Sequence, residues 1–250
     1  ASGGVLFTAF PTLNWWWTAP IGVALLTAAV AGARPLAGAV LGFVAGMVFF
    51  VPTLEWSGTY VGLLPWMALA VLQALYLAAL GLVLTLTRHV VLMTPLAWVV
   101  SELLRSTTPF GGFPWVRIAF SQADSPLATW ASVAGAPGVT FVVAILGATL
   151  YALARLLWQP DLRRSLATVV AVGASVLVIA GAVLVPRPSA GEAVPVAMVQ
   201  GNVPRPGLDF NAERRAVLDN HARGTALAVE QVGERRPEDL SLVIWPENSS

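Results

Sequence analysis

Long apolar stretches alternate with short polar breaks over the first three quarters of the chain. A bilayer core of about 30 Å is crossed by about 20 apolar residues in a helix. Six stretches meet or approach that length: Leu13–Ala33, Leu36–Leu54, Val61–Thr87, Val90–Leu104, Leu127–Leu157 and Leu166–Val185. Val5–Phe10, ahead of them, has the composition of the end of an earlier span. The pattern predicts an α-helical multi-span membrane bundle over residues 1–185.

Two of these stretches contain irregular features. Val90–Leu104 is short and includes Pro95 and Glu102. Leu127–Leu157 is long and is interrupted at Gly135–Gly138, so we expect a half-helix followed by a full span. Glycine repeats every four residues at Gly38, Gly42 and Gly46, a stripe that lets two helices approach closely. Tryptophans suited to the membrane interface lie near span ends, at Trp15–Trp17, Trp56 and Trp66.

Arginine is unevenly distributed between the loops. One alternating set of loops contains Arg34, Arg88 with His89, Arg155, Arg163 and Arg164. The other set contains Glu55, Arg105, Arg117 and Asp124. Because positive residues favour the cytoplasmic side, the first set is predicted to face the cytoplasm. The last span then delivers the residues after Val185 to the extracytoplasmic side.

The composition changes after Pro186–Pro188. Residues 186–250 contain 16 of the 27 charged side chains of the chain. Val194–Val199 is predicted to be a short buried strand, Asn211 to cap a helix that runs to about Gly233, and Leu240–Trp245 to be a second strand. One face of that helix would contain Val217, His221, Thr225, Ala228 and Val232. Strand, helix and strand in this order indicate a parallel crossover at the start of an α/β domain.

The composition excludes several classes of protein. With 57% hydrophobic and 11% charged residues, the chain is not an ordinary cytosolic domain. It has no Cys, and its 14 basic residues are all Arg, so these residues supply no disulfide, thiolate or side-chain amine. The net charge of +1 argues against a nucleic-acid partner. Because the chain opens at Ala1 and stops at Ser250 just after a motif, we expect a piece of a longer protein.

Glu247 is the first candidate for chemistry. It follows an apolar strand and Trp245-Pro246, at the end of a parallel strand where α/β folds place their sites. A partly desolvated carboxylate there is suited to act as a general base. The alternative is a solvated loop acid.

Glu102 and Arg105 form a second candidate, on one face of a short span. An ionisable residue at membrane depth is a functional hypothesis, and an ion pair that fixes the following loop is the structural alternative. That loop, Pro109–Trp115, is aromatic and glycine-rich, so it could enter the membrane and line a lipid cavity. His89 and His221 are expected on opposite sides of the membrane, and we predict neither a metal nor a cofactor.

Several segments resemble bacterial apolipoprotein N-acyltransferases. The motifs occur in the family's order and cover nearly the whole chain: Ala9–Pro11, Trp98–Arg105, Gly112–Trp115, Phe120–Leu127, Val199–Pro204 and Ile244–Glu247. The resemblance implies eight membrane helices, with an αββα nitrilase-like domain inserted on the outer side between the last two. Residues 1–185 would then be the end of the first helix plus six further spans, and residues 186–250 the first part of the nitrilase-like carbon-nitrogen hydrolase domain.

The resemblance also implies an activity in the bacterial inner membrane. Such enzymes transfer a fatty acyl chain from a phospholipid to the N-terminal amine of the diacylglyceryl-cysteine of an apolipoprotein. They work through a thioester on a Cys, assisted by a Glu and a Lys. By resemblance Glu247 is the general base, while the Lys and the Cys would lie beyond Ser250. A phospholipid donor and a diacylated lipoprotein acceptor are the expected partners.

Further positions are assigned to substrate binding. By resemblance Trp115 shapes the lipid entry, and Glu102 and Arg105 are candidates beside it. The family often has a Trp after Gln200-Gly201-Asn202, whereas the nearest aromatic residue here is Phe210. Phe210 is therefore the candidate for the cavity mouth.

Two other classes stay open. One is a membrane scaffold or anchor with a degenerate nitrilase-like part, for example a partner of a polyprenol-phosphate mannosyltransferase. The other is a transporter, because Gly and Pro interrupt several spans. Transport is the weaker alternative, since no inverted repeat is visible and Gln73 is one of few polar residues in mid-span.

Overall fold

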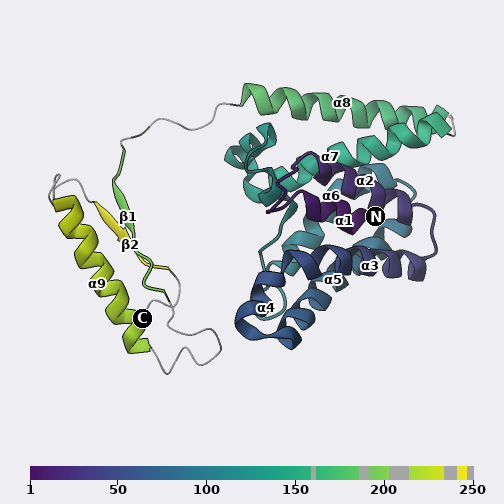
Figure 1. Cartoon of the computed structure of the whole chain (residues 1–250). Coiled ribbons are helices and arrows are strands. Elements are labelled where there is room, and N and C mark those ends of the chain that lie inside the picture. Colours follow the sequence, from purple (N-terminus) through teal and green to yellow (C-terminus); the bar gives the residue numbers. More distant parts are fainter. Residues whose placement is uncertain (159–161, 186–190, 192, 203–213, 234–240, 247–250) are drawn as a thin grey trace. The chain divides into compact units, whose positions relative to one another are not determined.

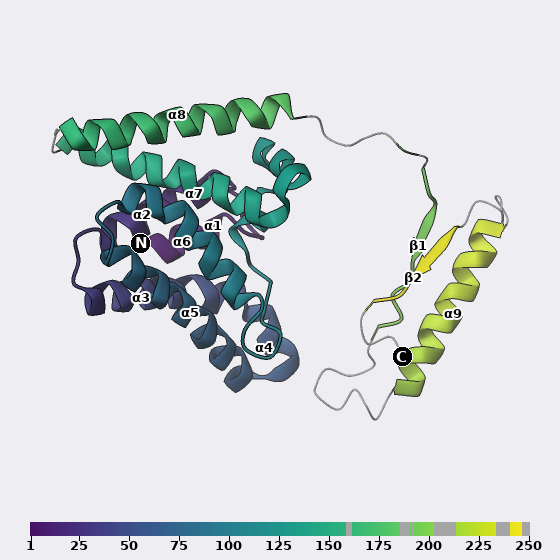
Figure 2. The same cartoon turned by 180° about the vertical axis from the view of Figure 1, so that it is seen from behind.

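The computed structural model describes residues 1–158, 162–185, 191, 193–202, 214–233 and 241–246. Two compact units are present: Ala1–Trp56 with Leu63–Pro188, and Ser57–Gly62 with Ser189–Ser250. Figure 1 shows the helices of the first unit and the strands of the second, and Figure 2 gives the reverse view.

Helices make up the first unit, although most of α4 falls in the segment Ser57–Gly62 of the second. The longer ones are α2 (Thr18–Val30), α3 (Pro35–Thr53), α5 (Leu63–Thr85), α6 (Val90–Arg105), α7 (Ala131–Trp158) and α8 (Leu162–Leu184). The shorter ones are α1 (Ser2–Thr8), α4 (Glu55–Val61), and the 3-10 helices η1 (Ile118–Gln122) and η2 (Pro126–Trp130). Each of the six predicted spans therefore contains a helix, and Val5–Phe10 falls at the end of α1.

Four helical segments are long and apolar enough to cross a membrane: Pro35–Thr53, Leu63–Thr85, Pro126–Trp158 and Ser165–Leu184. Between 28% and 44% of the residues in their apolar windows are buried in the unit, so each helix keeps a surface that can face lipid. The predicted α-helical membrane bundle is confirmed.

The prediction of a full span over Leu13–Ala33 is wrong in its length. Helix α2 has only 13 residues, or about 20 Å at 1.5 Å per residue. Asn14 and Gly32 have positive φ angles of 54° and 77°, which a right-handed helix does not admit. The apolar residues beyond α2 therefore belong to turns, and hydropathy alone does not distinguish these turns from helix.

The predicted interruption of Leu127–Leu157 is confirmed. Ala134 and Gly135 have non-helical backbone angles inside α7, just ahead of Pro137. The segment in front of the kink is the 3-10 helix η2 and a short turn, in place of the expected half-helix.

The glycine stripe works as predicted, because it brings α3 against α5. A Cβ atom on Gly46 would lie 2.7 Å from the Cα of Ala74, and one on Gly38 would lie 2.8 Å from the carbonyl oxygen of Gly81. A Cβ on Gly42 would overlap the carbonyl oxygen of Leu77. Backbones this close exclude any side chain larger than hydrogen.

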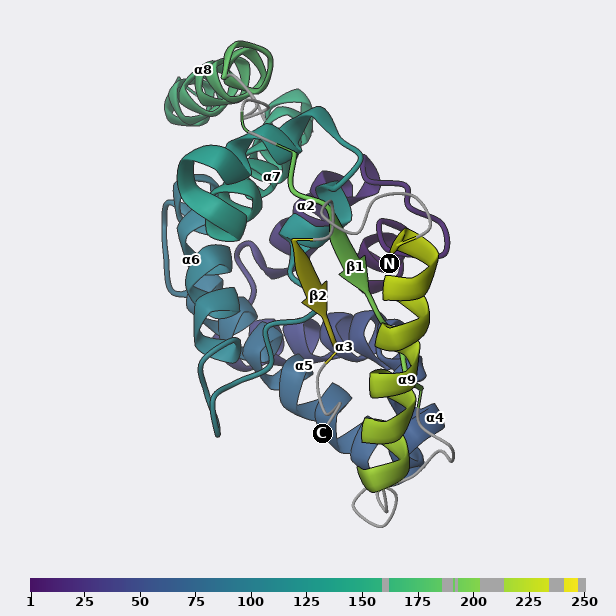
Figure 3. The same cartoon turned by 90° about the vertical axis from the view of Figure 1, so that its left-hand side faces the viewer.

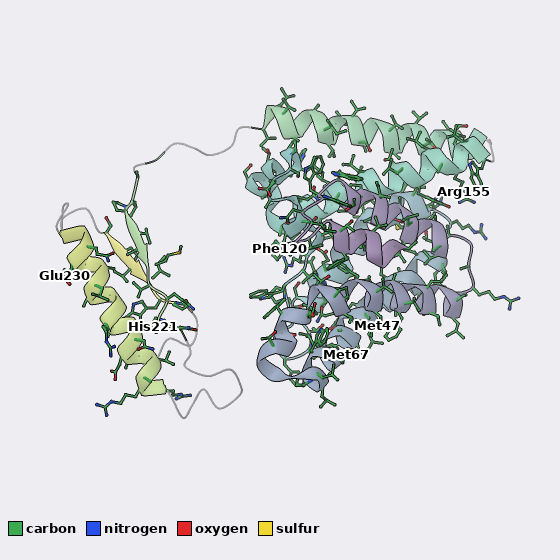
Figure 4. The ribbon with its side chains drawn as sticks, viewed as in Figure 1. Met47, Met67, Phe120, Arg155, His221 and Glu230 are labelled. Atoms are coloured by element: carbon green, nitrogen blue, oxygen red, sulfur yellow. The ribbon has the colours of Figure 1, made fainter. Side chains whose placement is uncertain are left out.

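The two ends of the bundle differ in their residues. Arg88, His89 and Arg155 line one pocket, and we call this the arginine end. The Trp56 ring lies 5.1 Å from that of Trp115, in a tilted arrangement, at the other end, which we call the tryptophan end. Figure 4 shows Phe120 and Arg155 at opposite ends of the unit. The loops that were predicted to share one side of the membrane lie at the same end of the bundle. Which end faces the cytoplasm stays a prediction.

The part of the second unit that follows the bundle in sequence is a parallel strand–helix–strand element. Strands β1 (Val196–Met198) and β2 (Leu242–Ile244) pair in parallel, and α9 (Arg214–Gly233) connects them in sequence. Figure 3 shows the two strands beside α9. The predicted crossover is confirmed.

One expectation about this unit needs correction, and others concern residues outside the described part of the chain. The first strand was expected to be buried, but Met198 is 84% exposed, and Val199 just after the strand is the buried residue. Val199 is covered by α9, whereas the described residues of this unit provide no cover for the other face of the strands. Val217 and His221 are buried on the expected face of α9. Asn211 and the side chain of Val232 lie outside the described residues.

Candidate functional site

A buried pair of ionisable residues lies in the last turns of α6. Glu102 is 6% exposed and Arg105 is 1% exposed. A charge that is removed from water is tolerated only where hydrogen bonds replace its hydration. The partners of the two side chains therefore show what they do.

The Arg105 guanidinium binds the carbonyl groups of the loop that follows α6. Its Nη1 donates to the carbonyl oxygens of Trp115 at 2.7 Å and Phe113 at 3.2 Å, and its Nη2 donates to that of Val116 at 2.6 Å. Nη1 also lies 3.2 Å from Oε1 of Gln73 on α5, and the Phe50 ring covers Cζ at 5.4 Å. The loop is thus wrapped around a planar fork of donors, an arrangement that arginine suits and lysine does not.

The Glu102 carboxylate connects the same loop to α7. Its Oε1 accepts the backbone N–H of Ile118 at 2.8 Å, and its Oε2 accepts the hydroxyl of Thr140 at 2.7 Å. Glu102 and Arg105 therefore hold the two ends of the segment 113–118. The expectation that they fix the following loop is confirmed, although through the loop's own backbone; their assignment to substrate binding stays a prediction.

The loop itself exposes aromatic rings at the tryptophan end. Gly111 and Gly112 have φ angles of 94° and 77°, and a Cβ on Gly112 would overlap the backbone of Ser106 and Thr107. Phe110 is fully exposed, and Trp115 is 56% exposed. The Trp115 ring lies 5.1 Å from that of Trp56 and 6.3 Å from that of Phe113. We call Trp56, Phe110, Phe113 and Trp115 the aromatic cluster.

Sequence reasoning missed the partners of this loop. Gln73 was visible only as a polar residue in mid-span, and Thr140 carried no signal in an apolar helix. Trp56 was interpreted as an interface residue, and its contact with Trp115 was not foreseen. A polar side chain in mid-span, as at Gln73, is the signal that could have pointed to Arg105.

The second unit brings two motif segments to one face of α9. The backbone N–H of Gly201 donates to Nε2 of His221 at 3.0 Å, and Nδ1 lies 2.7 Å from the carbonyl oxygen of Val217. Because Nε2 accepts, the proton must be on Nδ1. One turn further along α9, Thr225 accepts the indole N–H of Trp245 at 2.9 Å, and the rings of His221 and Trp245 are 5.4 Å apart. Figure 4 shows His221 on the strand-facing side of α9.

The residues that contact His221 and Thr225 follow the carboxyl ends of both strands. Gly201 follows β1 and Trp245 follows β2 directly, and in parallel strands these ends lie at the same edge. A Cβ on Gly201 would overlap the His221 ring, so glycine leaves the space that the imidazole fills. Glu247 and Phe210 lie outside the described residues. Within the described part of the chain, no three His, Asp or Glu side chains gather as a metal site would require.

These features are those of an integral membrane protein. Its helical bundle supports an exposed aromatic loop, and its chain continues into a parallel α/β element. Residues 2–149 match the family model described as the apolipoprotein N-acyltransferase N-terminal domain. The chain belongs to the apolipoprotein N-acyltransferase family, as the motifs indicated.

Curated relatives extend the similarity over the whole chain. The chain is 40% identical to an apolipoprotein N-acyltransferase of Mycolicibacterium smegmatis, over 99% of this chain and 45% of that protein. It is 31% identical to one of Methylococcus capsulatus, over 99% of this chain and 50% of the relative. It is 26% identical to one of Photobacterium profundum, over 98% and 48%. The chain thus spans about half the length of the curated relatives it matches.

Proposed function

We propose that this chain forms the membrane bundle and the first part of the catalytic domain of a lipoprotein N-acyltransferase. The enzyme transfers a fatty acyl chain from a membrane phospholipid to the N-terminal amine of a diacylglyceryl-cysteine. The observation that carries the proposal is the position of Trp245, which follows β2 at the carboxyl edge of a parallel pair and is held by α9. Trp245 belongs to the motif Ile244–Glu247, and in this chain the next residues of that motif are Pro246 and Glu247.

In the proposed reaction Glu247 is the general base in both halves. It first takes the proton of a cysteine thiol, and the thiolate attacks the phospholipid ester. A thioester forms, and the lysophospholipid leaves with the proton. The acceptor amine then attacks the thioester, Glu247 removes the amine's proton and passes it to the leaving thiolate, and the amide and the free thiol result. Splitting acyl transfer at a thioester replaces one difficult step by two easier ones.

The chain itself contains no Cys and no Lys. The thiol, and the Lys that would stabilise the oxyanion, therefore belong to the proposed remainder of a nitrilase-like domain that begins near residue 186.

The tryptophan end is the proposed entrance for the acyl donor. The aromatic cluster exposes large rings next to a polar backbone loop, a combination suited to the interface between headgroups and acyl chains. Arg105 and Glu102 hold this loop in place. The proposed orientation places the arginine end in the cytoplasm and the tryptophan end at the outer face of the bacterial inner membrane.

An acyl-transfer assay on the full-length protein tests this function. The purified protein in phospholipid–detergent micelles is incubated with a diacylglyceryl-cysteine peptide, and the product is read by mass spectrometry. We expect a gain of one acyl chain on the terminal amine, and no gain on a matched peptide whose amine is acetylated. A protein that leaves the free-amine peptide unchanged would refute the activity and favour the scaffold or anchor alternative.

A further inference from the structure

A second cavity lies at the arginine end, remote from the aromatic cluster. It is an open pocket with a volume of about 540 Å³, lined by the start of α6, the end of α7 and the start of α8. Its polar lining includes Arg88, His89 and Arg155, and its apolar lining includes Leu92, Ala152 and Leu166. The volume is within the range of sites for small ligands. The proposed acyl transfer makes no use of it.

The charge of this cavity is one-sided. Two guanidinium groups and an imidazole line it, and none of its described lining residues is a carboxylate. Guanidinium groups bind phosphate oxygens through paired N–H donors. The described lining therefore favours a phosphate-bearing anion.

One of the two arginines is held in position by its own helix. Arg155 Nη1 donates to the Tyr151 hydroxyl at 2.8 Å, and the Arg155 Cζ lies 5.9 Å from the centre of the Tyr151 ring. A guanidinium has five N–H donors, so this bond orients the group and leaves donors for a ligand. Figure 4 shows Arg155 at the end of α7 where the chain turns towards α8.

The apolar part of the lining distinguishes a lipid from a soluble anion. Leu92 and Leu166 line the cavity and are both strongly exposed on the surface of α6 and α8. In a membrane this surface meets acyl chains, so the cavity combines a cationic floor with an opening to the bilayer.

We propose that this cavity binds the phosphate group of an anionic phospholipid, with Arg88 and Arg155 as its ligands. The lipid lies in the leaflet at the arginine end, where it joins α6, α7 and α8. It is a resident lipid and not the acyl donor, which the proposed function assigns to the opposite end.

Lipid retention by the full-length protein tests this site, independently of acyl transfer. Delipidated protein in detergent is supplied with phosphatidylglycerol or phosphatidylcholine, and bound lipid is counted by native mass spectrometry. We expect a phosphatidylglycerol adduct on the wild type, and about tenfold weaker binding in the Arg88→Gln/Arg155→Gln protein because two charge-assisted contacts are lost. Arg34→Gln is the matched control, since Arg34 is exposed and does not line the cavity; it should bind as the wild type does.

The remaining outcomes separate the alternatives. Equal adducts with the two lipids, or equal adducts in the double variant and the control, would overturn the proposal. Displacement of the lipid by millimolar inorganic phosphate, with phosphate retained in its place, would assign the cavity to a soluble phosphate instead. The Arg88→Gln protein, changed at an exposed position, is measured alongside; unchanged thermal unfolding together with weaker lipid binding supports a direct contact.

Discussion

At the residue scale, the guanidinium of Arg105 organises the loop that carries Trp115. Four oxygen acceptors surround it, three of them backbone carbonyls between residues 113 and 116. Backbone carbonyls of an irregular loop at the edge of a membrane need donors, because lipid offers none. Arg105 supplies those donors, and Glu102 supplies the acceptor for the N–H of Ile118.

Arg105→Lys in the full-length protein tests this role. The ammonium keeps the charge but cannot reach three carbonyls in one plane. We expect a loss of about 1–3 kcal/mol in the free energy of unfolding and a higher KM for phospholipid with a smaller change in kcat, because the loop positions the entrance and not the reacting groups. Arg34→Lys is the control at an exposed site. Unchanged stability and an unchanged KM in the Arg105 variant would refute the positioning role.

These side-chain partners could not be predicted from the sequence. Arg105 and Gln73 are 32 residues apart, and Glu102 and Thr140 are 38 apart, on different helices. Their pairing depends on the packing of α5, α6 and α7, which hydropathy does not encode. By contrast, the fixing of the loop by Glu102 and Arg105 was one of the two alternatives that their spacing on one helical face and their position at its end suggested.

At the element scale, the periodic signals were reliable and the ends of elements were not. The glycine spacing predicted a close helix contact, and the structure identifies α5 as the partner, because only hydrogen fits between the backbones of α3 and α5. The length of α2 was overestimated because the helix ends at Val30, where Ala31 is extended, and because Asn14 and Gly32 lie in turns whose neighbours stay apolar. The crossover of β1, α9 and β2 was predictable from two short apolar runs separated by a helical pattern, whereas the contact of Trp245 with Thr225 depends on how α9 is rotated.

Gly42→Ala measures the helix contact directly. The added methyl group would overlap the carbonyl oxygen of Leu77, so α3 and α5 must separate. Overpacking of this kind costs about 1–3 kcal/mol, and we expect a lower midpoint of thermal unfolding in detergent. Gly173→Ala on α8 is the matched control, because its Cβ would meet no atom within 4 Å. Equal midpoints for the two variants would contradict the close packing.

At the scale of the whole molecule, a lipid-embedded bundle and a parallel α/β element share one chain. The uneven distribution of charge predicted this division, since residues 186–250 contain most of the charged side chains. The bundle offers aromatic rings at one end and arginines at the other. The α/β element holds the segment before Glu247 against α9, through Trp245 and Thr225. In the proposed enzyme the bundle admits the lipid donor, and the α/β part of the chain supplies the general base.

The most direct test of this account is acyl transfer by the full-length Glu247→Gln protein. A glutamine of the same shape cannot accept the proton of the thiol or of the amine. The account predicts that the variant no longer forms the acylated peptide, whereas Glu230→Gln, changed at an exposed position of α9, retains wild-type acylation. Wild-type acylation by the Glu247→Gln protein would contradict the assignment of the general base.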